Sequence, residues 1–135
     1  IETIEYFRKA YSLAKGSPRL TILQGLGVLQ DKKSRQLFVS ATQDTDLEIR
    51  LTGLWGLMRI GSATDFELLL SQSLKESGWG RIKATAYCLE LAERLAENGN
   101  KKEARAIYQE IKNSRTDENE SYLRETADQG LSLLN

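Results

Sequence analysis

The chain has 135 residues, with 19 Lys plus Arg, 19 Asp plus Glu, no histidine and one cysteine. This length predicts a single domain, and the balance of charge, which holds in both halves of the chain, argues against a surface built to bind polyanions. Without histidine the chain lacks the commonest general base and metal ligand, and one cysteine excludes both an internal disulfide and a thiolate-rich zinc site.

The first residues, Ile1-Glu2-Thr3-Ile4, contain neither a methionine nor the basic and apolar regions of a signal peptide. No stretch approaches the roughly 20 apolar residues that a membrane span requires. We therefore expect a soluble protein without membrane insertion, cytoplasmic by default. Export stays open, since the native N-terminus need not be part of this sequence.

A segment that begins with arginine recurs along the chain. Residues 19–29 and 50–60 agree at six of eleven positions, and residues 81–91 and 124–134 align with them more loosely. In every copy, three columns at i, i+4 and i+7 hold apolar or small residues, which is one face of a helix. These columns are Ile22/Gly53/Ala84/Ala127, Leu26/Leu57/Cys88/Leu131 and Leu29/Ile60/Leu91/Leu134. Each copy is predicted to be an amphipathic helix that buries this face.

A second set of segments with helical periodicity alternates with the first, at residues 4–14, 37–41, 66–70 and 104–111. Each repeat is therefore predicted to be a helical hairpin with antiparallel helices, because the loops between the segments are short.

Local motifs predict where these helices begin and end. Helix starts are indicated by Ser17-Pro18 and by the capping boxes Thr45-x-x-Glu48 and Thr64-x-x-Glu67. Left-handed C-caps are expected at Gly16, Gly61 and Gly99. Glycines inside the helices cost each helix roughly 1 kcal/mol relative to alanine, so we expect close helix packing at them. These are Gly25, Gly53, Gly56 and Gly130.

Residues 44–61 resemble the turn and second helix of a HEAT repeat, with an acidic turn, a hydrophobic-arginine pair, small residues and a Leu-x-x-Ile-Gly ending. The period resembles that of the short bacterial HEAT-like repeats named after phycobilisome lyases, although residues 91–108 are similar to a tetratricopeptide hairpin. The resemblance implies an all-α fold: a right-handed alpha-alpha superhelix, or ARM/HEAT-type solenoid, of about four helical hairpins. It would form one domain over residues 1–135, with repeats near 1–30, 31–61, 62–98 and 99–135.

The arginines that begin the repeated segments form one column: Arg19, Arg50, Arg81 and Arg124. Four stacked guanidinium groups suit a nucleic-acid backbone. Helical spacing, however, puts this column only about 60° from the centre of the buried face, so the heads should reach the turns between hairpins. Carboxylates that can accept from them there are Asp44, Asp46, Glu76, Asp117 and Glu118. The HEAT resemblance implies the same structural role, that of joining repeats.

Few side chains suggest a functional site. Trp55 lies on the mostly polar wedge of its helix, where it is either a binding anchor or a packing residue, and Trp79 is expected to pack over the start of the next helix. Cys88 shares its column with leucines and is expected to be an inert core thiol, since no histidine activates it. We expect no enzyme activity, no cofactor and no metal site.

The leading hypothesis is a non-catalytic scaffold that binds another protein or peptide along the face of the second helices. Its candidate binding residues are Gln24, Trp55, Arg59, Lys83, Glu90 and Gln129. One alternative is a nucleic-acid-binding module similar to HEAT-like DNA glycosylases, which the balanced charge disfavours. Another is a structural segment of a longer solenoid. Apolar residues at both ends of the chain favour that segment or end-to-end self-association.

Overall fold

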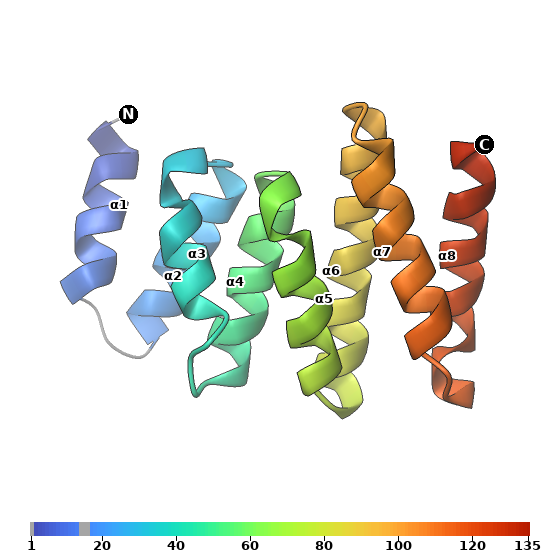
Figure 1. The fold of residues 1–135 in the computed structure, drawn as a ribbon. Helices are drawn as coiled ribbons and strands as arrows, with labels where there is room; N and C mark the ends of the chain where they lie inside the picture. Colours follow the sequence, from blue (N-terminus) through green and yellow to red (C-terminus); the bar gives the residue numbers. More distant parts are fainter. Residues whose placement is uncertain (1, 14–16) are drawn as a thin grey trace. The chain divides into compact units, whose positions relative to one another are not determined.

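In the computed structural model, residues 2–13 and 17–135 are described, and this part of the chain contains helices and no strand (Figure 1). The prediction of an all-α fold is therefore confirmed for the described residues. None of their helices combines the length and the apolar content that crossing a bilayer demands. The chain forms two compact units, Ile1–Ile60 and Gly61–Asn135, which we call the first and second unit.

The first unit consists of two helical hairpins. Its helices are α1 (Glu2–Leu13), α2 (Ser17–Val28), α3 (Arg35–Ala41) and α4 (Leu47–Arg59). A 3₁₀ turn, Lys32–Ser34, leads into α3. Within each hairpin the two helices pack against each other, and α2 also packs against α4. The second helices of the two hairpins therefore lie side by side.

The second unit also consists of two helical hairpins. They are α5 (Phe66–Lys75), α6 (Gly78–Glu97), α7 (Lys101–Ser114) and α8 (Ser121–Leu134). The 3₁₀ turns Ala63–Asp65 and Glu118–Glu120 precede α5 and α8. Consecutive helices pack against each other, and α6 and α8 are in contact as well. Each arginine-led segment lies largely in one of the even-numbered helices.

The predicted inner face of the repeated helix is largely buried. Leu26, Leu57 and Cys88 are inaccessible to solvent, and Leu131 in the same column is half-buried. The prediction is wrong for Leu29, whose side chain is 46 % exposed. Leu29 stands one residue past the end of α2, as Ile60 stands one residue past the end of α4, but only Ile60 is buried.

The glycines inside helices lie where a neighbouring helix approaches closely, as predicted. A Cβ atom at Gly53 in α4 would lie 2.7 Å from the carbonyl oxygen of Phe38 and 2.9 Å from the amide nitrogen of Thr42. At Gly56 a Cβ would overlap the Phe38 ring, and at Gly130 it would overlap the Tyr108 ring. The missing side chains thus let an aromatic ring or a backbone segment sit against the helix axis.

The helix starts differ from the predicted caps. The N-cap of α4 is Asp46, whose carboxylate accepts from the amides of Glu48 and Ile49, so the capping box at Thr45 is wrong by one residue. The box at Thr64 is also wrong, because Thr64 lies inside a 3₁₀ turn and α5 begins after it. Among the predicted C-caps, Gly61 and Gly99 have positive φ, 65° and 87°, whereas Gly16 lies outside the described residues.

Candidate protein-binding face

In the first unit, Arg19 connects the two hairpins. Its guanidinium donates to the Asp44 carboxylate in the turn between α3 and α4, over 2.6 Å. The carboxylate also accepts from the backbone amide of Asp46, and this bond, followed by Arg19, holds the pKa of Asp44 below its usual value. Arg50 donates to the carbonyls of Asp44 and Thr45 in the same turn.

Arg81 makes the corresponding connection in the second unit. Two of its nitrogens donate to the Glu120 carboxylate, over 2.8 Å and 3.1 Å, and so tie α6 to the turn before α8. The acceptor is therefore neither Asp117 nor Glu118, the two acidic residues that we predicted for this turn. Arg124 donates to the carbonyls of Arg115 and Asp117. Two arginines of the column thus bridge hairpins, and all four engage turns.

Of the predicted binding residues in the first unit, two take part in helix packing. The Trp55 indole is half-buried and lies against Gly27 in α2, where a Cβ would overlap the ring. Arg59 stacks over the same indole, at 5.9 Å from the ring centre, and donates to the carbonyls of Gly27 and Val28. Packing between α2 and α4 accounts for both side chains. Gln24 is exposed on α2.

The predicted binding residues of the second unit are all exposed. Lys83 and Glu90 lie on α6, and Gln129 lies on α8. The Lys83 ammonium is 5.7 Å from the centre of the Tyr87 ring, a cation–π contact along the same helix. Trp79, in the first turn of α6, is 62 % exposed, so the expectation that it packs over the helix start is wrong.

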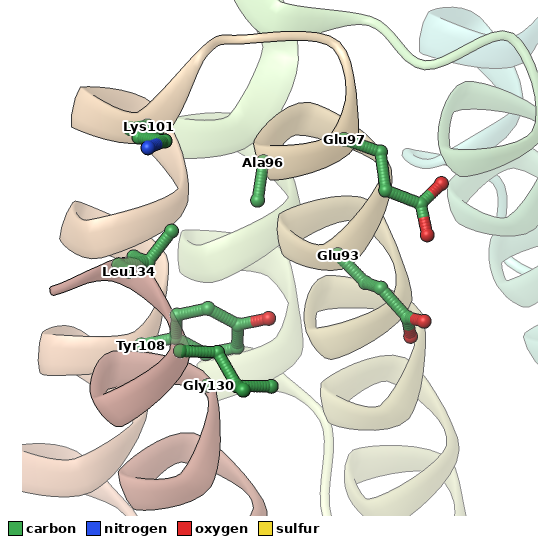
Figure 2. A pocket seen from close by; sticks show the side chains of 8 residues that line it. Glu93, Ala96, Glu97, Lys101, Tyr108, Gly130 and Leu134 are labelled. Carbon is green, nitrogen blue, oxygen red and sulfur yellow. The ribbon is translucent and has the colours of Figure 1, made fainter.

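A hollow of about 290 Å³ opens in the second unit between the C-terminal halves of α6 and α8. Helix α7 also contributes to its lining, and Figure 2 shows the side chains that surround it. They are Glu93, Ala96, Glu97, Lys101, Tyr108, Gly130, Leu133 and Leu134. We call this site the α6–α8 hollow. A second, more polar depression of about 410 Å³ shares Glu93 and Glu97 with it and continues to Glu90 and Arg94.

Tyr108 is the most buried polar side chain of the α6–α8 hollow. Its ring is only 6 % exposed because it packs over Gly130 of α8. Its hydroxyl points toward α6 in Figure 2, and it forms no hydrogen bond with any residue that the structure describes. Burial raises the pKa of Tyr108, and the carboxylates of Glu93 and Glu97 add to the shift. The phenol is therefore held in its neutral form.

A buried polar cluster in the second unit escaped the sequence analysis. Arg115, at the C-terminal end of α7, is fully buried, and its Nε donates to the Thr85 hydroxyl of α6 over 3.1 Å. Its guanidinium also donates to the hydroxyls of Ser73 in α5 and of Ser114. Burial lowers the pKa of Arg115. The sequence offers little signal for this cluster, because Arg115 stands in a polar segment outside the arginine column.

Cys88 lies in the same interior. Its Sγ is 3.8 Å from the Ser73 hydroxyl, and burial raises the pKa of the thiol to about 11. A thiol that stays protonated and inaccessible is a poor nucleophile. Among the described residues, no three His, Cys, Asp or Glu side chains are grouped so that they could hold a metal ion.

Comparison of the chain with protein-family models, with curated proteins and with solved structures gives no match.

Proposed function

We propose that the chain is a non-catalytic interaction scaffold of HEAT-like repeats that binds a protein or peptide along the face of its second helices. The proposal includes the right-handed superhelix of about four hairpins. Four antiparallel hairpins and the two arginine-carboxylate pairs that connect hairpins within the units support it. The buried, protonated Cys88 thiol is consistent with a protein that performs no covalent chemistry.

The observation that carries the proposal is the outer surface of α6 and α8. There the second helices expose a cation at Lys83, a carboxylate at Glu90 and an amide at Gln129. Farther along the same pair of helices lies the α6–α8 hollow. A surface that combines varied polar side chains with a recess suits recognition of a partner chain, since buried anchors in pockets carry most of the affinity of an interface.

Site-specific photo-crosslinking tests the proposal directly. A photoreactive amino acid is placed at Gln24 or Gln129, which are exposed on second helices α2 and α8. Gln36 and Gln109 are matched controls, because they are exposed glutamines on first helices α3 and α7. In extract from the native organism, we expect a discrete crosslinked species from Gln24 and Gln129 and little from the control positions.

Equal crosslinking from first and second helices would contradict the assignment of the binding face. The nucleic-acid alternative is tested separately, by a gel-shift titration at low salt with single- and double-stranded DNA and RNA. We expect weak binding because basic and acidic residues balance. Tight binding that weakens steeply with added salt would favour the nucleic-acid-binding module over the protein-binding scaffold.

A further inference from the structure

We propose that the α6–α8 hollow receives a lysine or arginine side chain of the partner. The inference rests on the proposed function, because it specifies what the partner presents to one part of the second-helix face. It is drawn from the two carboxylates, the Tyr108 hydroxyl and the apolar side chains that line the hollow.

The rim of the hollow carries two carboxylates on α6. Glu93 and Glu97 are one helical turn apart on α6, so their carboxylates lie on the same side of the helix, as Figure 2 shows. Neither carboxylate forms an ion pair with any residue in the described part of the chain. Lys101 lines the opposite side of the hollow, away from both. An incoming cation would therefore find two carboxylates within one turn.

The second feature is the hydroxyl of Tyr108. The hydroxyl oxygen is not among the buried unpaired atoms of the described residues, so water reaches it and a ligand donor would replace that water. The Tyr108 side chain is more than nine-tenths buried, and its hydroxyl points toward α6 from inside the hollow without a partner among the described residues. A neutral phenol oxygen accepts from N–H donors. The hydroxyl is thus a third acceptor, on a different helix from the carboxylates.

The third feature is the apolar wall. Ala96, Gly130, Leu133 and Leu134 also line the hollow. The Leu133 side chain is 86 % exposed, so a ligand would cover apolar surface that now faces water. Lysine and arginine carry several methylene groups below a charged head, and such stems pack on apolar surface while the head makes polar contacts. An anionic side chain or a phosphate would face two like charges instead.

The test uses the purified full chain and small probes that isolate one side chain. Nα-acetyl-lysine methylamide and Nα-acetyl-arginine methylamide are titrated while the backbone amides are followed by ¹H–¹⁵N NMR. Nα-acetyl-norleucine methylamide is the matched probe, because it keeps the stem and lacks the charge. We expect shifts at the amides of Ala96 and Gly130, with a dissociation constant on the order of 1 mM for a ligand of this size. Norleucine should bind at least about 10-fold more weakly.

Four variants locate the binding groups. Tyr108→Phe keeps the ring over Gly130 and removes only the hydroxyl, so we expect about a 3-fold to 5-fold loss of affinity with an intact fold. Glu93→Gln and Glu97→Gln should each weaken binding about 3-fold to 10-fold. The control Glu110→Gln, an exposed carboxylate on α7 outside the hollow, should leave it unchanged.

Equal binding of norleucine and lysine, shifts confined to other parts of the chain, or full affinity in the Tyr108→Phe variant would each overturn the inference. If any of these results is obtained while Gln129 still crosslinks to a partner, the site for a lysine or arginine side chain is rejected. The proposed interaction scaffold is then still supported. The reverse result, lysine binding in the hollow without second-helix crosslinking, would reject the proposed function alone.

Discussion

The buried guanidinium of Arg115 donates to hydroxyls from α5 and α6 within the second unit. Its removal takes a charged donor from these hydroxyls and opens a cavity, so Arg115→Ala should lower the free energy of unfolding by about 3 kcal/mol. Urea denaturation followed by circular dichroism measures the change. Lys102→Ala, at an exposed position of α7, is the control and should change stability by less than about 0.5 kcal/mol. Equal effects of the two substitutions would show that the cluster does not stabilise the unit.

The Cys88 thiol makes stability depend on alkaline pH. Its folded pKa is raised to about 11, whereas a thiol in an unfolded chain has a pKa of about 8.5. Above the lower value the unfolded chain releases a proton that the folded chain keeps, so stability is full below about pH 8.5 and falls as the pH rises to about 11. The loss should amount to roughly 3 kcal/mol.

Urea unfolding at several values between pH 8 and pH 11 checks this dependence. Tyr87 and Tyr108 also have raised pKa values and add to the decline at the upper end. The informative quantity is therefore the difference from the Cys88→Ala variant, which should lose less stability across the range. Identical pH profiles for the two proteins would argue against a buried thiol.

The burial of a residue could be predicted from the sequence where helical periodicity determines it. It was less predictable where contacts between helices determine it. The Cys88 column correctly placed the thiol in the interior. Its position on the helix allows the Trp55 indole to be either a binding anchor or a packing residue. Only the contact with the neighbouring helix shows that it fills the space left by Gly27. The burial of Arg115 depends on hydroxyls 30 and 42 residues away in the sequence, which no local pattern specifies.

At the scale of the element, contact between α3 and α4 depends on the absence of a side chain at Gly53. Gly53→Ala should destabilise the protein by about 2 to 3 kcal/mol, because the new Cβ meets backbone atoms of α3 that cannot move aside. Thermal or urea unfolding measures the loss.

Gly25→Ala is the matched control in the same unit. Its Cβ would lie 3.3 Å from the Phe7 ring, a side chain that can adjust, and alanine gains roughly 1 kcal/mol in helix propensity. The net change should be within about 1 kcal/mol of zero. A Gly53 variant as stable as the Gly25 variant would contradict the close approach.

The existence and order of the helices were predictable, because apolar residues recur with a helical period in every segment. The helix starts were less predictable. A threonine three residues before a glutamate predicts a capping box at Thr45, but the chain turns one residue later, where Asp46 has the extended backbone that a cap requires. The 3₁₀ turns that precede three of the helices have no distinct sequence signature.

At the scale of the whole molecule, each unit contains one tryptophan, Trp55 in the first and Trp79 in the second. The variants Trp55→Phe and Trp79→Phe therefore leave a fluorescent reporter in one unit each. If the hairpins form one domain, as the repeat pattern predicts, the two variants should unfold in urea with fluorescence transitions that coincide with circular dichroism. The fluorescence and circular dichroism transitions are compared within the same variant, so a change in stability caused by the tryptophan substitution affects both equally.

Fluorescence and circular dichroism transitions that separate within a variant would instead favour two independently folding units. The hairpin order follows from the sequence, since loops of a few residues force adjacent helices together. The prediction of one domain over residues 1–135, by contrast, depends on coupling between distant hairpins, and this experiment measures that coupling.

The pairing of a ring with a glycine on the facing helix has a consequence for how this sequence can diverge. Phe38 faces Gly56, Trp55 faces Gly27 and Tyr108 faces Gly130. Enlarging the glycine alone produces a clash, and shrinking the aromatic residue alone leaves a void. In descendants of this chain the two members of a pair should therefore be replaced together. Position 108 is constrained more tightly if its hydroxyl also recognises a partner, because phenylalanine would then satisfy the packing and fail the recognition.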